Sequence, residues 1–239
     1  MWKQIDFHTH ILPGMDDGSQ NAEESFIMLE MMKAQGIDAI VASPHFYPGQ
    51  NFEHFFEKRQ RSIEEFLRVY SAEEHPKIYV GAEVAFFPGI GKSQNVKKLC
   101  ILGTRYLLLE MPFERWSNEV VNEVLALKEN DITPIIVHVE RYTKFLKKKQ
   151  LFHLINDGVF IQSNAAFFCD RKTQRKSLRM LRSGEIHLLG SDCHNTTERP
   201  PNLKGAMDVI FDRLGEAYLS EIQQISNDVL GKAMRLEEL

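Results

Sequence analysis

The stretch Asp6-Phe7-His8-Thr9-His10 begins within a short apolar segment, residues 4–7, and extends just beyond it. The interpretation of the whole chain depends on this stretch. Residues two apart in an extended chain point to the same side, so His8 and His10 can bind one metal ion from a single strand. Near the other end of the chain, Gly190-Ser191-Asp192-Cys193-His194 offers a carboxylate and an imidazole in the same way. Either motif alone is a weak signal. A fold that brings both to one place would build a metal site.

Seven short apolar segments alternate along the chain with longer segments of helical periodicity. Most are rich in Ile, Val, Leu or Tyr, which is typical of strands buried on both faces. Their ranges are 4–7, 37–42, 78–82, 106–109, 132–137, 159–162 and 186–189. Alternating strands and helices indicate a mainly parallel sheet. Because the composition does not change between the strands, we predict an α/β fold in which a single domain, residues 1–239, forms a closed or nearly closed barrel.

Capping signals and glycines set the ends of the predicted helices. The first helix begins near Asn21, with Glu24 three residues later as in a capping box, and ends at Gly36. Apolar spacing predicts further helices within 52–70, 117–127, 151–158 and 178–184. After Leu203 the pattern is helical to the end of the chain, and a break is predicted near Asn227.

The composition narrows the possible function classes. The 239 residues are 43% hydrophobic, and 33 acidic against 29 basic residues give a net charge of -4, which argues against a nucleic-acid partner. A chain of this length needs no disulfide, and its three cysteines form no disulfide framework. No run approaches the ~20 apolar residues of a membrane span, and the amino terminus has no apolar signal core. We therefore expect a cytoplasmic protein without membrane insertion.

Side chains that bind metal ions follow most of the predicted strands. They are His8, His10, His45, His138, His194, Glu83, Glu110 and Asp192. The carboxyl ends of parallel barrel strands converge on one face, which carries the active site in such folds. Unpaired carboxylates in that position would repel one another and lose hydration at high cost, so divalent cations are the simplest way to stabilise them. Imidazoles and carboxylates together suit Mn, Fe, Zn or Mg rather than a thiolate zinc site.

The segments at the strand ends resemble the polymerase and histidinol phosphatase (PHP) family, in that family's order. They are 6–10 (DFHTH), 43–45 (SPH), 81–83 (GAE), 109–110 (LE), 137–138 (VH) and 190–194 (GSDCH). Within the family, 10–19 (HILPGMDDGS), 43–47 (SPHFY) and 138–142 (HVERY) are most similar to the bacterial tyrosine-protein phosphatases that accompany capsule or exopolysaccharide tyrosine kinases. The resemblance implies a distorted TIM-like (β/α)7 barrel of the PHP type. It also implies a phosphotyrosine-bearing protein substrate, namely a tyrosine autokinase that controls polysaccharide synthesis.

The resemblance further implies a centre of two or three divalent ions, with manganese preferred and Fe, Zn or Mg as alternatives. The ligands of the first ion would be His8, His10, Glu83 and Asp192. Glu83 would bridge to a second ion, also held by Glu110 and His138. The third would be held by Asp17, His45 and His194, and the adjacent Asp16 leaves the choice of aspartate open.

Two arginines complete the predicted site. Arg141 and Arg199 match arginines that bind phosphate in these phosphatases, and a guanidinium offers the planar fork that suits phosphate oxygens. Aromatic residues near the same strand ends could flank a phenyl ring, although packing in loops explains most of them better. They are Phe46, Tyr47, Phe86, Phe87, Phe113, Trp116, Tyr142, Phe167 and Phe168. Asn164, after the sixth strand, is a weaker candidate for a hydrogen bond to substrate.

Three alternatives stay open at this point. Cys193 and Arg199 have the Cys-x5-Arg spacing of cysteine-dependent tyrosine phosphatases, but the loop between them has no glycine and Asp192 disfavours a thiolate. A histidinol-phosphate or other small-molecule phosphatase would share the metal ligands. A non-catalytic metal-binding regulatory module would need no pair of arginines for phosphate.

Overall fold

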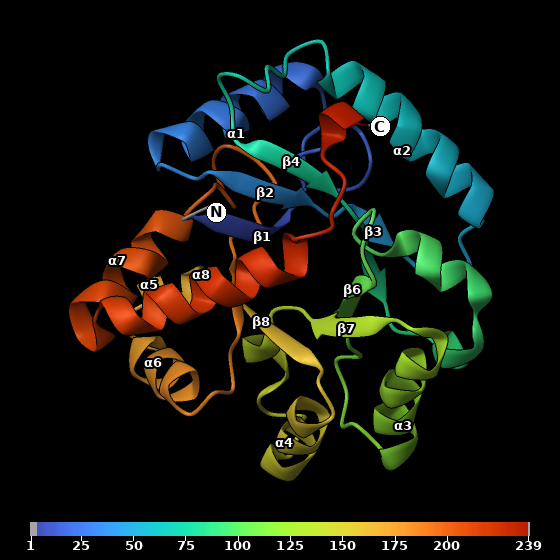
Figure 1. Cartoon of the computed structure of the whole chain (residues 1–239), viewed down its shortest axis with the longest axis vertical. Helices are drawn as coiled ribbons and strands as arrows, with labels where there is room; N and C mark the ends of the chain where they lie inside the picture. The colour runs from blue at the N-terminus through green and yellow to red at the C-terminus, as the bar shows by residue number, and fades with distance from the viewer. Residues whose placement is uncertain (1–3, 239) are drawn as a thin grey trace.

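All seven predicted strands are present in the computed structural model, which describes residues 4–238 (Figure 1). They are β1 (Ile5–Thr9), β2 (Ala39–Ala42), β4 (Lys77–Val80), β6 (Tyr106–Glu110), β7 (Thr133–Ile136), β8 (Phe160–Asn164) and β9 (Leu188–Gly190). Their ends differ from the prediction by no more than two residues. Every pair within the sheets is parallel, as the alternation of strands and helices predicts.

Two further strands, β3 (His45–Phe46) and β5 (Glu83–Ala85), escape the sequence prediction. Each continues the course of the strand before it after a short interruption, so β3 follows β2 and β5 follows β4. Segments of two and three residues are too short to show a periodic pattern. They pair with each other, and His45 lies opposite Glu83. The missed strands therefore place two predicted metal ligands side by side.

The strands form two sheets that curl round a common interior. One sheet has the order β1-β2-β4 and the other β3-β5-β6-β7-β8-β9. The end of β1 also meets the chain after β9: Thr9 and Cys193 form a parallel bridge, and the His10 amide donates to the Cys193 carbonyl at 2.9 Å. This contact brings the first and the last predicted motifs together.

The helices pack around the outside of the curled sheets (Figure 1). The α-helices are α1 (Ala22–Ala34), α2 (Phe52–Phe66), α3 (Asn118–Ala126), α4 (Lys148–Asn156), α5 (Ala166–Cys169), α6 (Gln174–Arg182), α7 (Leu203–Leu214) and α8 (Glu216–Leu230). Short 3-10 turns are η1 (Ile90–Lys92), η2 (Gln94–Leu99), η3 (Leu127–Asn130), η4 (Val139–Tyr142) and η5 (Leu236–Glu238). As predicted, the Asn21 side chain caps α1 by accepting from the Glu24 amide.

The predicted break near Asn227 is wrong. Asn227 lies inside α8, where its side-chain amide donates to the Gln223 carbonyl at 2.7 Å. The helical region is interrupted at Gly215 instead, which separates α7 from α8. Gly215 has a φ of 92°, a left-handed value that glycine adopts without the strain other residues incur. A glycine was thus a better signal for the break than an asparagine.

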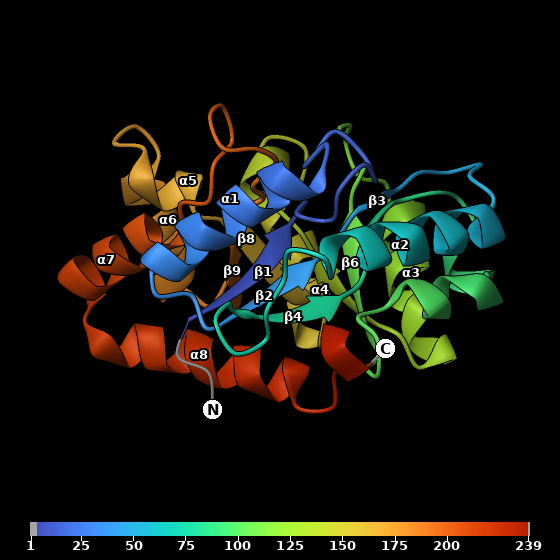
Figure 2. The same ribbon diagram turned by 90° about the horizontal axis from the view of Figure 1, so that it is seen from above.

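Apolar side chains fill both sides of the sheets. Leu107 and Leu109 of β6 point outward into the core beneath the helices, whereas Leu108 points inward with Phe7. The inner core also contains Val229 and Leu230 of α8, and Figure 2 shows α8 crossing beneath the sheet. Each such fully buried side chain contributes ~1.5–3 kcal/mol to stability. The inner core closes the amino ends of the strands and leaves their carboxyl ends for polar groups.

Among residues 4–238, no helix has the length and apolar content that crossing a membrane requires.

Candidate metal centre

All nine predicted metal ligands lie at the ends of strands or in the segments that follow them: His45 and Glu83 begin β3 and β5, which continue β2 and β4, and Asp17 lies between β1 and α1. Each of them approaches at least one other within 3.7 Å, as a chain of imidazole–carboxylate contacts shows. Seven of them, together with Asp16, form four overlapping groups of three donor atoms that could each hold an ion, and His138 and Asp192 belong to none of these groups. The structure thus brings together residues from position 8 to position 194.

Glu83 lies at the centre of this cluster. Its Oε1 is 2.7 Å from Nε2 of His138, and its Oε2 is 3.0 Å from Nε2 of His8. The same Oε2 lies 3.0 Å from Nδ1 of His45 and 3.3 Å from Nε2 of His10. A carboxylate with two oxygens facing four imidazoles has the geometry of a bridging ligand between metal ions.

Asp192 and Glu110 lie on either side of Glu83. Oδ1 of Asp192 is 3.4 Å from Nε2 of His10 and 3.6 Å from Nε2 of His8. Oε1 of Glu110 is 3.6 Å from Nε2 of His138. Burial and repulsion by Glu83 raise the pKa of Glu110 to about 7. Three carboxylates this close together need positive charge between them.

The structure distinguishes the roles of the two adjacent aspartates. Oδ2 of Asp16 accepts from Nδ1 of His10 at 2.8 Å and from the backbone amide of His45 at 2.8 Å. Asp17 is instead 67% exposed, and its Oδ1 is 3.6 Å from Nε2 of His45 and 3.5 Å from Nε2 of His194. Asp16 therefore contacts His10 and the backbone of His45, whereas Asp17 faces His45 and His194. Both aspartates and His45 together form one of the candidate metal groups.

In two of the imidazole rings, a hydrogen bond at one nitrogen determines whether the other nitrogen has a lone pair available for a metal ion. Nδ1 of His194 can only donate to the Asp192 carbonyl, 3.0 Å away, which leaves Nε2 as the lone-pair nitrogen. That Nε2 is buried and has no hydrogen-bond partner. Nδ1 of His138 lies 3.0 Å from the Tyr142 hydroxyl, which also accepts from the Met111 amide at 3.1 Å. This is the arrangement of imidazoles that bind metal through Nε2.

The ionisation states of four of the predicted ligands suit a metal ion. Burial opposes charge on Glu83 and Asp192, but the surrounding imidazoles outweigh it, together with Arg141 at Asp192, and hold both carboxyl pKa values well below their usual range. Burial lowers the pKa of His138 and of His194 to about 4. Ionised carboxylates and neutral imidazoles are the forms that bind metal. The buried Nε2 of His194 and the neutral rings of His138 and His194 fit divalent ions. Burial opposes charge on His8 and His10, but Glu83, Asp192 and, at His10, Asp16 outweigh it and raise both pKa values, so metal binding would displace these protons.

The backbone at two ligands adopts conformations that ordinary residues avoid. His138 has a φ of 37° and Asp192 a φ of 56°, both in the left-handed region. Gly190, just before Asp192, permits a close approach to β1, since a Cβ there would lie 2.6 Å from the Cβ of His8. Such strain persists only where the surroundings enforce it, and it gathers at functional sites.

Both predicted arginines converge on Asp192. Nη2 of Arg199 is 2.9 Å from Oδ2 of Asp192, and Nη2 of Arg141 contacts the same oxygen. The two side chains are 39% and 35% exposed, so each guanidinium has donors left for a ligand. Both arginines therefore form ion pairs with a buried carboxylate of the predicted metal centre and not with a carboxylate on the surface.

Several supporting residues were not predicted. Oδ1 of Asp6 accepts from the backbone amides of His8 and Ser191, which ties the first motif to the last. Gln162 accepts from the His138 amide at 2.8 Å, and Asn164, only a weak candidate in the sequence, donates to Oδ2 of Asp192 at 2.8 Å. One signal was available: an aspartate two residues before His8 lies on the same side of an extended strand as that histidine.

The aromatic residues divide into core and rim. Phe46, Trp116, Tyr142, Phe167 and Phe168 are buried in the core, and Phe86 and Phe87 pack against it. Tyr47 and Phe113 are exposed beside the centre. The Tyr47 ring stacks on His45 with centroids 5.0 Å apart, and Phe113 packs against Tyr142 at 5.4 Å. Two of the nine aromatic side chains are thus placed to meet a substrate ring.

Cys193 lies inside the protein. Its side chain is fully buried, and burial raises the pKa of the thiol well above the usual value. A nucleophilic cysteine needs an accessible thiolate. The structure therefore contradicts the reading in which Cys193 and Arg199 form a cysteine-dependent phosphatase loop.

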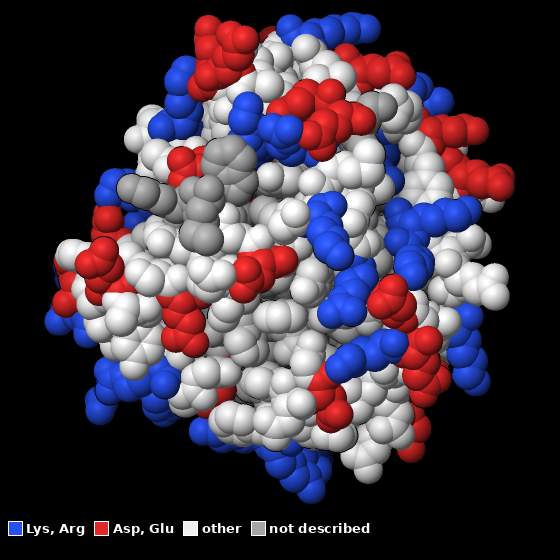
Figure 3. Space-filling model, in the orientation of Figure 1, with Lys and Arg blue, Asp and Glu red and all other residues white. Residues whose placement is uncertain are grey.

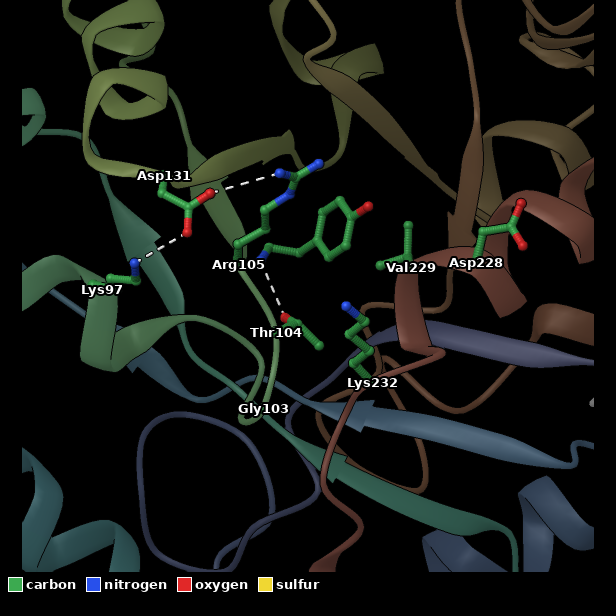
Figure 4. A pocket seen from close by; sticks show the side chains of 9 residues that line it. Lys97, Gly103, Thr104, Arg105, Asp131, Asp228, Val229 and Lys232 are labelled. Carbon is green, nitrogen blue, oxygen red and sulfur yellow. Dashed lines mark hydrogen bonds and ion pairs between the residues drawn. The ribbon is translucent and has the colours of Figure 1, made fainter.

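A hollow of about 530 Å³ lies at the other end of the strands, between the start of β6 and the end of α8 (Figure 4). Asp131 at its edge is 3.2 Å from Nζ of Lys97 and 3.6 Å from Nη1 of Arg105. Basic and acidic side chains are interspersed on this face (Figure 3). None of the four candidate metal groups found in residues 4–238 includes a residue of this hollow.

This chain is similar in sequence to a protein family and to individual proteins of known function. A family model described as capsular polysaccharide synthesis, CpsB/CapC, matches residues 4–230. The tyrosine-protein phosphatase CpsB of Streptococcus pneumoniae is 28% identical over 232 residues, covering 91% of this chain and 94% of CpsB. The tyrosine-protein phosphatase YwqE of Bacillus subtilis (strain 168) is 27% identical over 216 residues, covering 88% of this chain and 85% of YwqE.

A solved structure has the same fold. It comes from work on YwqE from Bacillus subtilis and CpsB from Streptococcus pneumoniae, described there as unique metal-dependent tyrosine phosphatases. It matches this chain with a TM-score of 0.78 at 23% identity, and the match covers 97% of each chain. The α/β architecture with its curled parallel sheet is therefore shared over nearly the whole length.

Proposed function

This chain belongs to the capsular polysaccharide synthesis family CpsB/CapC, and on that premise we propose that it is a metal-dependent protein-tyrosine phosphatase. The observation that carries the proposal is the position of Glu83, whose carboxylate lies within 3.3 Å of four imidazoles. Protonated imidazoles and the two arginines offset part of the carboxylate charge in this cluster, and bound cations would offset the rest. The family membership and the site geometry lead independently to the same class of enzyme.

We propose that the centre holds two or three ions, with manganese preferred. The first ion would bind His8, His10, Glu83 and Asp192. The second would bind Glu83, Glu110 and His138, and the third Asp17, His45 and His194. The contacts of Asp16 with His10 and with the His45 amide support Asp17 as the ligand, because Asp16 is already engaged behind them. Such ions, when bound, would supply Lewis acidity and an activated water.

Arg141 and Arg199 would bind the phosphate. Both guanidinium groups meet at Asp192, so an anion next to that carboxylate would receive donors from two sides. Oδ2 of Asp192 also accepts from Asn164, which fixes the carboxylate and, through it, the arginines. In the transition state of an in-line displacement, these donors would stabilise charge on the equatorial phosphoryl oxygens.

Tyr47 and Phe113 would flank the phenyl ring of the substrate. Both rings are exposed next to groups of the centre, and offset stacking between aromatic rings is favourable. The site would hold the phosphate between the two arginines, and the ring would extend outward between these side chains. Water would attack the phosphorus directly as the bond to the phenol oxygen breaks, so no covalent enzyme intermediate is needed.

The finer features of the resemblance belong to the same proposal. We propose that the two sheets, joined at Thr9 and Cys193, make a distorted TIM-like seven-stranded barrel of the PHP type. Residues 1–239 would form one domain. The substrate would be a phosphorylated tyrosine autokinase of a capsule or exopolysaccharide system, as the family's role in capsular polysaccharide synthesis suggests.

The test is hydrolysis by manganese-loaded protein of two substrates at equal concentration, a phosphotyrosine peptide and histidinol phosphate. We expect turnover of the peptide to exceed turnover of histidinol phosphate, to stop with EDTA and to survive Cys193→Ser. A preference for histidinol phosphate would make the chain a small-molecule phosphatase. No turnover of either substrate, nor of p-nitrophenyl phosphate, would leave a metal-binding regulatory module.

A further inference from the structure

The segment 171–182, with the sequence RKTQRKSLRMLR, is more basic than any other stretch of twelve residues in this acidic chain; 141–152, with five basic residues and no acidic one, comes next. Segment 171–182 carries six of the 29 basic residues and no acidic residue, although the chain as a whole has a charge of -4. Most of the segment forms α6, which buries Ser177, Met180 and Leu181 on one face. The basic residues occupy the other face. We call this surface the α6 basic face; it consists of Lys172, Arg175, Lys176, Arg179 and Arg182.

The side chains of the α6 basic face lie around one hollow and are not dispersed over the surface. Its side chains line a hollow of about 670 Å³ together with the half-buried Leu178. Within residues 4–238, none of its five cations forms an ion pair with a carboxylate. Basic side chains are visible at the lower left of Figure 3, where α6 lies in Figure 1.

This arrangement disfavours the helix that carries it. Arg175 and Arg179 are four residues apart within α6, and like charges at that spacing repel. Arg175 and Lys176 also lie in the first turn, which contains no acidic residue and meets the positive end of the helix dipole. An anionic partner on this face would remove both disadvantages.

The α6 basic face adjoins the candidate active site. Nζ of Lys176 donates to Oγ1 of Thr143 at 2.7 Å. Thr143 follows η4, the turn that carries Arg141, and is two residues beyond that arginine. A polypeptide whose phosphotyrosine is held by Arg141 would therefore run close to Lys176 and onto α6.

On the basis of the proposed function, we propose that the α6 basic face binds an acidic segment of the protein substrate that flanks its phosphotyrosine. Charge complementarity selects an anionic partner, and the contact between Lys176 and Thr143 places that partner beside the reacting group. The chemistry does not favour an anionic membrane, because surface helices insert large apolar side chains into lipid. Among residues 4–238, no exposed large apolar side chain belongs to this face.

The test compares two phosphotyrosine peptides of equal length, one with glutamate and one with glutamine at the flanking positions. Wild-type, manganese-loaded protein is expected to have a lower KM for the glutamate peptide, and this preference should fade at high salt. In R175Q/R179Q/R182Q the KM for the glutamate peptide should rise roughly tenfold, with kcat and the turnover of p-nitrophenyl phosphate unchanged. The matched control R61Q/R68Q/K98Q removes three exposed cations elsewhere and should behave as wild type.

Each other outcome is decisive. Equal KM values for the two peptides in wild type would overturn the inference while leaving the proposed function intact. Failure of wild type to hydrolyse both peptides and p-nitrophenyl phosphate would instead overturn the proposed function. If the triple variant loses p-nitrophenyl phosphate turnover, the double variant R179Q/R182Q replaces it. Cosedimentation with anionic phospholipid vesicles that the variant abolishes, with the KM ratio unchanged, would assign the face to membrane binding and overturn the peptide proposal.

Discussion

At the carboxyl ends of the strands, five imidazoles and four carboxylates from β1 to the chain after β9 crowd into one cluster, and eight of them are at most 14% exposed. At the amino ends, charged residues such as Lys97 and Asp131 are more than half exposed around a hollow, and they pair with one another. The same parallel strands thus end in two very different charged surfaces. One is a concentration of buried charge, and the other is an ordinary solvated surface.

The difference lies in what balances the charge. Water and exposed partners are enough for Asp131, whose pairs with Lys97 and Arg105 lie at the surface. Glu83 and Asp192 are almost fully buried, and they depend on imidazoles and guanidinium groups in the structure and, in our account, on cations. Burial of groups that can bind metal, rather than the size of a cavity, therefore distinguishes the carboxyl ends of the strands as the candidate functional site.

The largest expected effect comes from Glu83→Gln, at the centre of the buried cluster. An amide cannot bridge two cations as a carboxylate does, so kcat/KM for a phosphotyrosine peptide should fall by at least ~10³-fold. Metal content should fall as well, and circular dichroism should show an intact fold. Full activity in this variant would mean that the cluster is structural.

Arg141→Gln and Arg199→Gln should each lower kcat/KM by ~10²-fold, because each removes donors to the transferring phosphoryl group. Unlike the Glu83 variant, they should retain the wild-type metal content. Steady-state kinetics together with metal analysis measure both quantities. Loss of metal in either arginine variant would show that these side chains stabilise the centre instead of binding substrate.

Substitutions of the two adjacent aspartates test which of them binds a metal ion and which only orients a metal ligand. Asp17→Asn should reduce the number of ions bound at saturation, whereas Asp16→Asn should lower metal affinity by ~10–100-fold at unchanged stoichiometry. Manganese titration followed by elemental analysis distinguishes the two. The reverse pattern would exchange the roles assigned to Asp16 and Asp17.

Glu140 provides a pH-dependent test at the same end. Burial raises its pKa to about 7, above its unfolded value, so its contribution to stability is present at low pH and is lost as the pH rises to 7. In metal-free protein, the melting temperature of wild type should therefore fall relative to that of Glu140→Gln between pH 5 and pH 8, by about 5–10 °C. A constant difference between the two proteins would contradict the shifted pKa.

The smallest effect is expected at the amino ends. Lys97→Gln and Arg105→Gln remove exposed partners of Asp131 and should change kcat/KM and metal content by no more than about twofold. The same assays as for Glu83→Gln give the comparison directly. A tenfold loss of activity would show that the two ends of the strands are coupled.

Much of the contrast between the carboxyl ends and the amino ends of the strands could be predicted from the sequence. Apolar runs such as 132–137 and 106–109 locate the strands, because strands buried on both faces must be continuously apolar. Parallel pairing then forces the residues that follow each strand onto one face. His138 and Glu110 were placed at the site in this way, from strand ends alone.

Other features could not be predicted, for identifiable reasons. β3 and β5 are too short to form a periodic pattern, although they pair His45 with Glu83. The hydrogen bonds of Asp16 and Tyr142 to the predicted ligands depend on side-chain directions at turns, which no spacing rule gives. The left-handed backbone at His138 and Asp192 is imposed by the surrounding structure rather than by residue preference.

The most direct test of the central claim is elemental analysis of wild-type protein purified without chelator and then incubated with manganese. If the buried carboxylates and imidazoles are held together by cations, mass spectrometry should find two to three divalent ions per chain. A protein that binds no ion under these conditions, yet folds and keeps its nine ligand side chains together, would contradict the account.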